Sequence, residues 1–510
     1  MPSGSPRTLS MEDRRMRLRH MMHVFDKPLS YKQTLQMRKS YIGRSCKLHF
    51  EVSPLKIVRA SRQYLYDEAG NEFLDCINNV SHVGHCHPHV VSVGQEQMSK
   101  LTTSAGFLND QMSEYAKRLI STFPEKLCVC FFLNSGSEAN DLALRLARCY
   151  TKHEDVLCLE RAYHGNLANL LDISPSRFKK TGHKQRDYVH IAPCPDVYRG
   201  KYRDDTPNPE VAYADEILLL LQKAKAKGRK IGAFICEPLM GAAGVIVFPK
   251  NYLKLAYSYV REAGGVCIAD EVQCGLGRNG EHLWAFQSHD VVPDIVTIGK
   301  PVGNGHPMSV VVTSKEIADS LGEFSSTFGG NPVACATGMA VLDVIQNEKL
   351  ISSAQSVGKC LLEGFTAILP NHPMMGCVRG MGMLVGVEIV MDKESRKPAK
   401  EAAEILAYQM KEQRILIAND GEDQNVMVLM PPMCFTCDNA RQVIQVFDKA
   451  LRDIETGAVS VGLTQGGDIF TVAPPLDVPL QVISETPELS DEDDDSDDPA
   501  LKRPRYEEMD

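Results

Sequence analysis

The feature that most constrains the fold is an alternation of short apolar runs with helical periods between residues 88 and 335. The runs are LCVCFFL (127–133), DVLCL (155–159), IGAFIC (231–236), GVCIAD (265–270) and DIVTIGK (294–300). Runs of this length without polar alternation are typical of strands buried on both faces. Strands that alternate with helices form βαβ units. We therefore predict an α/β fold whose large domain contains a mainly parallel central sheet.

The flanking segments predict a second, smaller α+β domain. Short strand patterns with a turn at 67–70 precede the large domain, and helical stretches near 333–346, 350–368 and 399–413 follow it around an apolar run at 381–390. Residues past 458 lose periodicity and gain proline and acid, which indicates disorder. The expected organisation is an N-terminal extension (1–39), the first part of the small domain (40–87), the large domain (88–335), the rest of the small domain (336–457) and an acidic tail (458–510).

The net charge of −9 is concentrated at the C-terminus. Residues 485–510 hold twelve acidic and three basic side chains, so residues 1–484 carry 53 of each sign. Nucleic-acid binding needs clustered excess Lys and Arg, and no apolar run approaches the length of a membrane span. We therefore expect neither nucleic acid nor a membrane as partner.

The sixteen cysteines follow no disulfide framework that spacing alone reveals. We expect free thiols in a reducing compartment. Cys434 and Cys437 have the spacing of half a zinc site, but no second pair follows at suitable spacing, so we expect no metal. Residues 1–27 are rich in Arg but contain three acids. An Arg-rich start favours a mitochondrial location, with the cytoplasm as the alternative.

Three charged side chains fall at or just beyond the ends of successive predicted strands: Glu237, Asp270 and Lys300. Taken singly, a strand-end Asp often caps a helix and a Lys is usually solvated. Ligands of open α/β sheets, however, bind at the carboxyl ends of the strands. We expect the three side chains to converge there.

A phosphate site is indicated by NSGSEAN at 134–140, between a predicted strand and a predicted helix. Small residues at a helix start let backbone N–H groups approach a phosphate, and the helix dipole also attracts an anion. The strand-to-helix context makes this interpretation stronger than a Gly-Ser pair alone.

Over nearly all of residues 40–455 the sequence resembles the class III family of pyridoxal-phosphate enzymes. The matching stretches are NNVSHVGHCHP (78–88), NSGSEAN (134–140), AYHG (162–165), IADEVQCGLGR (268–278), TIGKPVGNGHP (297–307) and STFGGNP (326–332). The resemblance implies the fold type I architecture and the cofactor pyridoxal 5'-phosphate. As an ordered set these motifs are highly specific.

The resemblance implies a role for each matching side chain in the reaction. Lys300 would carry the cofactor as a Schiff base and move the proton, while Asp270 would pair with the pyridinium nitrogen and keep the ring an electron acceptor. Gln273 would bond the ring hydroxyl. Glu237 and His164 are expected on the substrate side.

The resemblance also implies how the cofactor ring and phosphate are held. Val272 would pack on one ring face and Tyr163 on the other. Gly136 and Ser137 would bind the phosphate, joined by Thr327 donated from a second subunit. A homodimer is then the minimum active unit, and a homotetramer is the alternative.

Within the family the sequence most resembles the phospho-lyase branch, which acts on phosphoethanolamine or 5-phosphohydroxylysine. The stretches that point there are DCINNVSHVGHCHP (75–88), EANDLALRLAR (138–148), DISPSRF (172–178), APCPDVYRGKYR (192–203) and PPMCFTCDNARQV (431–443). The last favours the phosphohydroxylysine enzyme. The implied reaction eliminates phosphate and ammonia to leave an aldehyde. A transaminase normally has an arginine before the Pro-Pro dipeptide, where NVMVLM (425–430) has no cation.

The predicted substrate pocket departs from that branch. Val428 and Met430 stand where relatives carry lysines, and Asn166 stands where a histidine is expected. A phosphate dianion needs charge-assisted donors, so these must come from elsewhere. The candidates are three histidines: His85, His87 and His164.

Three functional hypotheses follow. The first is a phospho-lyase acting on a phosphorylated amine. The second is an ω-aminotransferase with a keto-acid acceptor, to which Glu237-Pro238 is a partial pointer. The third is a cofactor-binding scaffold with little turnover, motivated by the lost cations. Phosphate release separates the first hypothesis from the others, and conversion of an added keto acid identifies the second.

Overall fold

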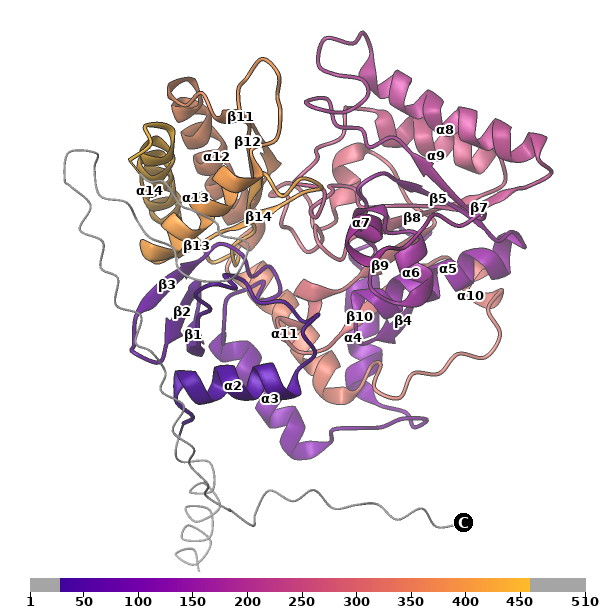
Figure 1. Cartoon of the computed structure of the whole chain (residues 1–510). Coiled ribbons are helices and arrows are strands. Elements are labelled where there is room, and N and C mark those ends of the chain that lie inside the picture. Colours follow the sequence, from indigo (N-terminus) through magenta and orange to yellow (C-terminus); the bar gives the residue numbers. More distant parts are fainter. Residues whose placement is uncertain (1–27, 459–510) are drawn as a thin grey trace, which may run out of the picture.

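The computed structural model describes residues 28–458 (Figure 1). Residues 1–27 of the predicted N-terminal extension (1–39) and residues 459–510 of the predicted acidic tail (458–510) lie outside the described residues. Within 28–458, no helix is both long and apolar enough to cross a membrane.

A seven-stranded sheet forms the centre of the large domain, in the order β4-β10-β9-β8-β7-β5-β6. Its strands are β4 (Val129–Leu133), β5 (Asp155–Leu159), β6 (Val189–Ala192), β7 (Ile231–Cys236), β8 (Val266–Asp270), β9 (Ile295–Ile298) and β10 (Ser309–Thr313). The strands β9, β8, β7, β5 and β6 are parallel neighbours. The predicted α/β class with a mainly parallel sheet is confirmed.

The sequence pattern did not predict β6 or β10, and β10 makes the sheet mixed. It is antiparallel to both β4 and β9. Only residues 299–308 separate β9 from β10. That connection is shorter than the dozen or more residues of a parallel crossover, so the chain must return antiparallel.

Helices cover both faces of this sheet, which explains its continuous apolar strands. Alternate residues of β5 point to opposite sides, with Val156 and Cys158 in one core cluster and Leu157 and Leu159 in another. Helix α5 (Gly136–Thr151) packs in the first cluster, while α8 (Pro209–Ala226) and α9 (Tyr252–Glu262) pack in the second (Figure 1). The side chains of a strand alternate between its two faces. When both faces are buried, the sequence shows no alternation of apolar and polar residues.

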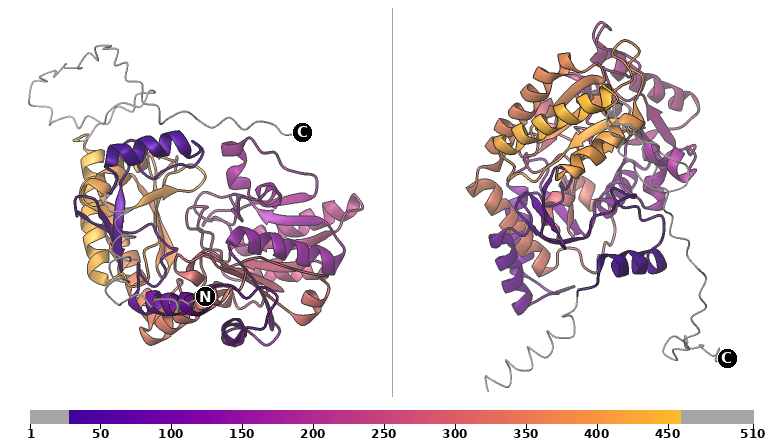
Figure 2. Two further views of the ribbon diagram at one scale, coloured as in Figure 1. Left: turned by 90° about the horizontal axis from the view of Figure 1, so that it is seen from below. Right: turned by 60° about the vertical axis from the view of Figure 1, so that its left-hand side comes forward.

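Two smaller sheets lie beside the large one. The first has the order β1-β2-β3-β13 and the second β11-β12-β15-β14. Their strands are β1 (Ile57–Ser61), β2 (Tyr64–Asp67), β3 (Glu72–Asp75), β11 (Met375–Met381), β12 (Leu384–Ile389), β13 (Ile415–Leu416), β14 (Ala418–Asp420) and β15 (Val426–Leu429). Because β13 pairs with β3, the N-terminal and C-terminal segments share one sheet. Figure 2 shows these segments, in indigo and orange, side by side.

The remaining long helices connect and cover these sheets. They are α2 (Tyr31–Tyr41), α3 (Pro88–Lys100), α4 (Asp110–Ile120), α11 (Pro332–Asn347), α12 (Leu350–Ile368), α13 (Lys400–Glu412) and α14 (Cys437–Glu455). Short helices are α6 (Ala168–Asp172), α7 (Phe178–Thr181) and α10 (Lys315–Asp319), with 3-10 turns η2 (Pro175–Arg177), η3 (Ala285–His289), η4 (Lys300–Gly303) and η5 (Leu369–Asn371). Helix α11 is buried along most of its length, as expected of a helix between two domains.

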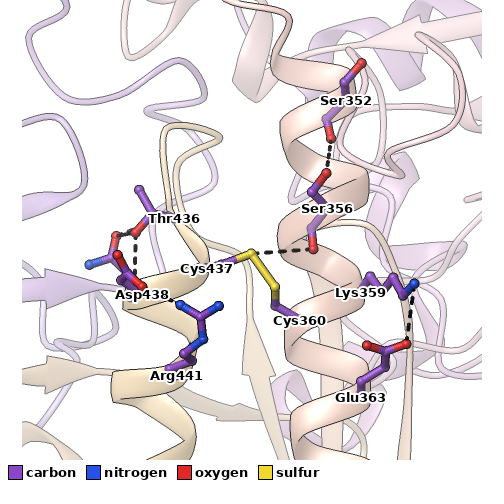
Figure 3. Close-up of a disulfide and its surroundings, with 10 residues drawn as sticks. Ser352, Ser356, Lys359, Cys360, Glu363, Thr436, Cys437, Asp438 and Arg441 are labelled. Atoms are coloured by element: carbon purple, nitrogen blue, oxygen red, sulfur yellow. Dashed lines mark hydrogen bonds and ion pairs between the residues drawn. A yellow bond between two sulfur atoms is a disulfide. The ribbon is translucent and has the colours of Figure 1, made fainter.

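The prediction that all cysteines are free is wrong for one pair. Cys360 on α12 and Cys437 on α14 form a disulfide, with Cα atoms 5.9 Å apart and a sequence separation of 77 (Figure 3). The two helices pack against each other, and this tertiary contact brings the two thiols together. The spacing of the cysteines along the chain did not indicate this disulfide. The other cysteines of the described region are free.

Candidate active site

A cavity of about 320 Å³ lies at the carboxyl ends of the large sheet's strands. It gathers nine of the residues that the sequence singled out: Gly136, Ser137, Tyr163, His164, Glu237, Asp270, Val272, Gln273 and Lys300. Thr327 does not line it and borders a separate cavity of about 520 Å³. The predicted convergence at this sheet edge therefore holds for all but Thr327 within one subunit.

Lys300 begins the turn after β9 and extends into this cavity. Its φ of 29° is unusual for a residue with a side chain, and such backbone is found preferentially at functional sites. Its Nζ donates to Oε1 of Gln273. Burial lowers the pKa of Lys300, although the charges of Glu237 and Asp270 oppose that effect. A lowered pKa gives the amine more of its neutral, nucleophilic form.

Asp270 ends β8 and is 2% exposed. Its Oδ2 accepts from Nδ1 of His164 and from Nδ2 of Asn140, each at 2.8 Å. Its Oδ1 accepts from the backbone N–H of Val272 at 3.1 Å. These contacts fix the direction of the carboxylate at the base of the cavity. His164 thus acts on Asp270, which differs from its expected place among the substrate contacts.

The cradle for an anion is the first turn of α5. Ser135 caps this 16-residue helix by accepting from the backbone N–H of Glu138. The first N–H groups of a helix have no partner within it, and here Gly136 and Ser137 of the first turn line the cavity. A Cβ on Gly136 would lie 2.7 Å from Cγ1 of Val272. Only glycine lets the helix start approach the strand ends this closely.

Arg177 is a site residue that the sequence analysis did not single out, although it lies in the DISPSRF stretch. It ends the 3-10 turn η2 and lines the cavity. Its guanidinium lies 4.5 Å from the ring centroid of Tyr163, a cation–π distance. No motif of strand ends or glycines marks this position, so only the resemblance could have suggested it.

Two acids face Lys300 from the other walls. Glu237 follows β7, is 4% exposed, and accepts from the Gly241 N–H at 3.1 Å through Oε2. Its Oε1 is buried without a hydrogen-bond partner among the described residues. Burial, aided by the charge of Asp270, raises the pKa of Glu237 to about 8. Asp420, at the end of β14, was not predicted, and burial raises its pKa as well.

The wall formed by β15 and its end is apolar. Met430 lines the cavity and its sulfur lies 2.8 Å from Nε2 of Gln273. Val428 is 1% exposed and packs in an apolar cluster with Val426 and Leu384, behind that wall. Of the two positions that lack the expected lysines, only Met430 therefore reaches the cavity.

Two of the proposed histidine donors are engaged elsewhere, and that expectation is wrong for them. His85 bonds Asp75 at 2.7 Å and Ser81 at 2.9 Å. His87 pairs with Glu348 at 2.8 Å. Neither lines the cavity. Both lie in the loop before α3.

These features fit pyridoxal 5'-phosphate as a set. Lys300 offers an amine for its aldehyde, Asp270 a fixed carboxylate for its ring nitrogen, and the α5 start a glycine-lined cradle for its phosphate. Val272 and Tyr163 line the cavity between these groups and can pack on the ring.

Comparison with known proteins agrees with this geometry. The sequence is 47% identical over 437 residues to the alanine–glyoxylate aminotransferase 2-like protein of Drosophila melanogaster, covering 84% of this chain and 88% of that one. It is 41% identical over 439 residues to the ethanolamine-phosphate phospho-lyase homolog 1 of Caenorhabditis elegans, covering 83% and 94%. A solved phospholyase from Arthrobacter in complex with phosphoethanolamine matches with a TM-score of 0.78 and 35% identity, covering 82% and 99%.

The family profile described as aminotransferase class-III matches residues 49–451, a span that includes every part of the cavity wall. That span contains the glycine cradle at the start of α5, the carboxylate at the end of β8 and the lysine after β9. The chain belongs to the class III aminotransferase family and is an enzyme of that fold that uses pyridoxal 5'-phosphate.

Proposed function

We propose that this enzyme is a phospho-lyase that converts a phosphorylated amine and water to an aldehyde, ammonia and phosphate. The observation that carries the proposal is the β15 wall of the cavity. Met430 lies there against Gln273, so that strand supplies no cation for the carboxylate of a keto-acid acceptor. The similarity to a phospho-lyase homolog and to a phospholyase bound to phosphoethanolamine supports the same reaction.

The roles of the chain's own residues follow from their positions. The bound cofactor supplies an electron sink that stabilises negative charge on the substrate carbon. The amine of Lys300, once released, takes the proton from the carbon beside the substrate nitrogen. Asp270, held by His164 and Asn140, keeps the ring nitrogen protonated. The C–O bond to phosphate then breaks, and the phosphate leaves with the electron pair.

Arg177 is the proposed donor for the departing phosphate. It is the arginine of the described cavity lining, and a guanidinium binds phosphate through charge-assisted hydrogen bonds. Its contact with the ring of Tyr163 helps to keep it ordered while it holds the anion.

We also propose that a homodimer completes the site. Thr327 borders a second cavity with Gly106 and Phe107. Exposed side chains surround it: Phe107 is 83% exposed, Leu108 103% and Phe328 66%. Such apolar exposure in one region is typical of a protein interface. A partner placed there would bring Thr327 to the phosphate of the other subunit.

The test is an assay of phosphate, ammonia and aldehyde with phosphoethanolamine and with 5-phosphohydroxylysine. The three products should appear in equal amounts without any added keto acid. Arg177→Ala should raise KM about tenfold, and Arg177→Lys should restore part of the loss. Arg186→Ala is the matched control, because Arg186 is exposed and bonds Asp172 outside the cavity. Phosphate that stays bound to carbon during turnover contradicts the proposal.

The second candidate is an ω-aminotransferase. The name of the Drosophila relative and the glutamate that follows β7 favour it. Turnover that requires pyruvate or glyoxylate, with no phosphate released, would establish this reaction. Cofactor binding without either product would instead favour the scaffold hypothesis.

A further inference from the structure

Helix α2 is an 11-residue helix without a buried residue. Two side-chain hydrogen bonds tie it to the segment that follows it: Tyr31 donates to the carbonyl of Pro54 at 3.0 Å, and Arg38 to that of Cys46 at 2.7 Å. Figure 2 shows the helix, in indigo, at the edge of the molecule. Helices this short are marginal in water and gain most of their stability by packing an apolar side against a neighbour. Nothing in residues 28–458 buries a side of α2.

Exposed apolar side chains show which part of α2 is uncovered. Met37 is 46% exposed, Tyr41 80% and Ile42, directly after the helix, 45%. Ile42 also lines a groove of about 210 Å³, together with Leu35 and Pro54. An apolar groove next to exposed apolar side chains is typical of a surface that another segment or protein covers.

The same part of the chain carries five cations and no acid. Residues 28–50, which we call the basic face, contain Lys32, Arg38, Lys39, Arg44 and Lys47. Lys47 pairs with Glu51 at 2.9 Å. Lys32, Lys39 and Arg44 have no ion-pair partner among the described residues. The groove is therefore bordered by cations whose charge the described chain leaves uncompensated.

The rest of the described chain has the opposite net charge. Residues 51–458 contain 42 basic and 48 acidic side chains. A second cluster of cations lies at the end of α8, with Lys223, Lys225 and Lys227. That helix already buries five residues, among them Ile217 and Leu221, and so needs no further packing partner. The basic face differs from this cluster because it combines uncompensated cations with an uncovered helix.

The C-terminal tail has the complementary composition. Seven of the eight residues 491–498 are acidic, and the apolar run VPLQVI (478–483) precedes them. Blocks of like charge often serve as interaction segments. Residues 459–490 separate the acidic run from the described chain, and a chain of these 32 residues spans about 30 Å on average and at most about 110 Å. The radius of gyration expected for the described residues is about 22 Å, so the tail can reach the basic face from the end of α14.

We propose that residues 478–498 of the tail dock on the basic face. The apolar run packs on the exposed side of α2, and the acidic run pairs with the cations around the groove. Because the tail belongs to the same chain, its effective concentration at this surface is about millimolar, so weak surface ion pairs are enough to hold it. The docked tail stabilises α2 and keeps other polyanions from the basic face. The inference is independent of the reaction that the enzyme catalyses.

The first test measures how fast an acetylating reagent modifies single lysines of the full-length enzyme with bound cofactor, read by mass spectrometry. The comparison chain has the seven acids of residues 491–498 replaced by their amides. Lys32 and Lys39 should react about threefold more slowly in the wild type than in this variant. The difference should vanish at about 1 M salt, where the screening length is about 3 Å. Lys225, in the α8 cluster, is the matched control and should react equally in both chains.

The second test uses a carbodiimide, which joins a carboxylate directly to a lysine amine. Crosslinks should form between residues 491–498 and Lys39. Lys32→Glu/Arg44→Glu should lower their yield about fivefold, because two attractive charges become repulsive. Lys223→Glu/Lys227→Glu makes the same change of net charge on α8 and should leave the yield unchanged. An equal fall in both double variants would mean that net charge alone controls the yield, and it overturns the inference.

Other occupants of the basic face give different results, and each of these results overturns the inference. If Lys32 and Lys39 react slowly both with and without the acidic run, a second copy of the chain covers the face. If they react as fast as Lys225 in both chains, the face is open. Crosslinks that join isotope-labelled to unlabelled molecules would assign the face to the tail of another molecule. Binding of the wild type to vesicles of anionic lipid, lost in Lys32→Glu/Arg44→Glu, would assign it to a membrane.

Discussion

The carboxyl groups on the two sides of the cavity differ in how completely they are hydrogen-bonded. On the cofactor side, which we define as Lys300, Asp270 and the α5 start, each carboxylate oxygen of Asp270 has a protein donor. On the substrate side, which we define as Glu237, Asp420, Arg177 and Met430, one buried oxygen has none. The cofactor side is built to hold one group in one orientation. The substrate side is completed only by its ligand.

The origin of the two sides explains the difference. The cofactor side comes from consecutive elements of one sheet, where backbone pairing fixes the strand ends. The substrate side joins a loop after β7, the turn η2 and the small-domain strands β14 and β15. Elements from separate domains can change without altering the sheet, so substrate preference can diverge while the cofactor chemistry stays.

The largest effect is expected from a substitution that removes the lysine of the cofactor side. Lys300→Ala should abolish turnover and the visible absorption of covalently bound cofactor, because no other group of the described cavity is an amine. Spectra and a product assay measure both. Lys250→Ala, at an exposed position outside the cavity, should change neither. A borohydride-reduced peptide carrying the cofactor on a different lysine would disprove the assignment.

The next largest effect distinguishes the rate of the reaction from the binding of the cofactor, again on the cofactor side. Asp270→Asn removes a negative charge that stabilises the protonated ring but leaves the α5 cradle intact. The value of kcat should fall about 100- to 1000-fold, whereas the dissociation constant of the cofactor should change by less than about tenfold. Steady-state kinetics and a cofactor titration measure the two. Equal losses would mean that Asp270 mainly anchors the cofactor.

A matched pair of lysine substitutions tests the wall on the substrate side. Val428→Lys buries a charge in an apolar cluster and should lower the free energy of unfolding by about 3 kcal/mol or more. Met430→Lys reaches the cavity beside Gln273 and should change the free energy of unfolding by about 1 kcal/mol or less. Urea denaturation at one saturating cofactor concentration compares them. Similar losses in both would show that Met430 belongs to the core and not to the cavity wall.

The smallest expected effect concerns the small domain, which provides part of the substrate side. Cys437→Ser should lower the free energy of unfolding by about 2 kcal/mol under non-reducing conditions, because the disulfide closes a long loop in the unfolded chain. A reductant should bring the wild type to the level of the variant. Cofactor absorption should not change, since the disulfide joins α12 to α14, which lie away from the large sheet (Figure 1). A stability difference that persists in reductant would mean that the disulfide is not its source.

Prediction from sequence succeeded where local patterns coincide with structure. The run IGAFIC is β7 residue for residue, and the helical stretch at 350–368 is α12. Strand β10 was missed. Its antiparallel direction is set by the short connection from β9, and a short apolar run in the sequence does not indicate the direction of a strand. The Cys360–Cys437 disulfide was missed because it depends on the packing of two helices.

The sequence by itself determined the parallel sheet and the placing of Glu237, Asp270 and Lys300 at its carboxyl edge. The physical reason is that strand ends in successive βαβ units must meet at one edge. The tertiary structure alone decided that Arg177 and Asp420 join them and that Val428 does not. Asp420 reaches the cavity and Val428 misses it through the docking of the small domain on the large sheet, whereas Arg177 reaches it from the turn η2 of the large domain. No pattern along the chain records either placement.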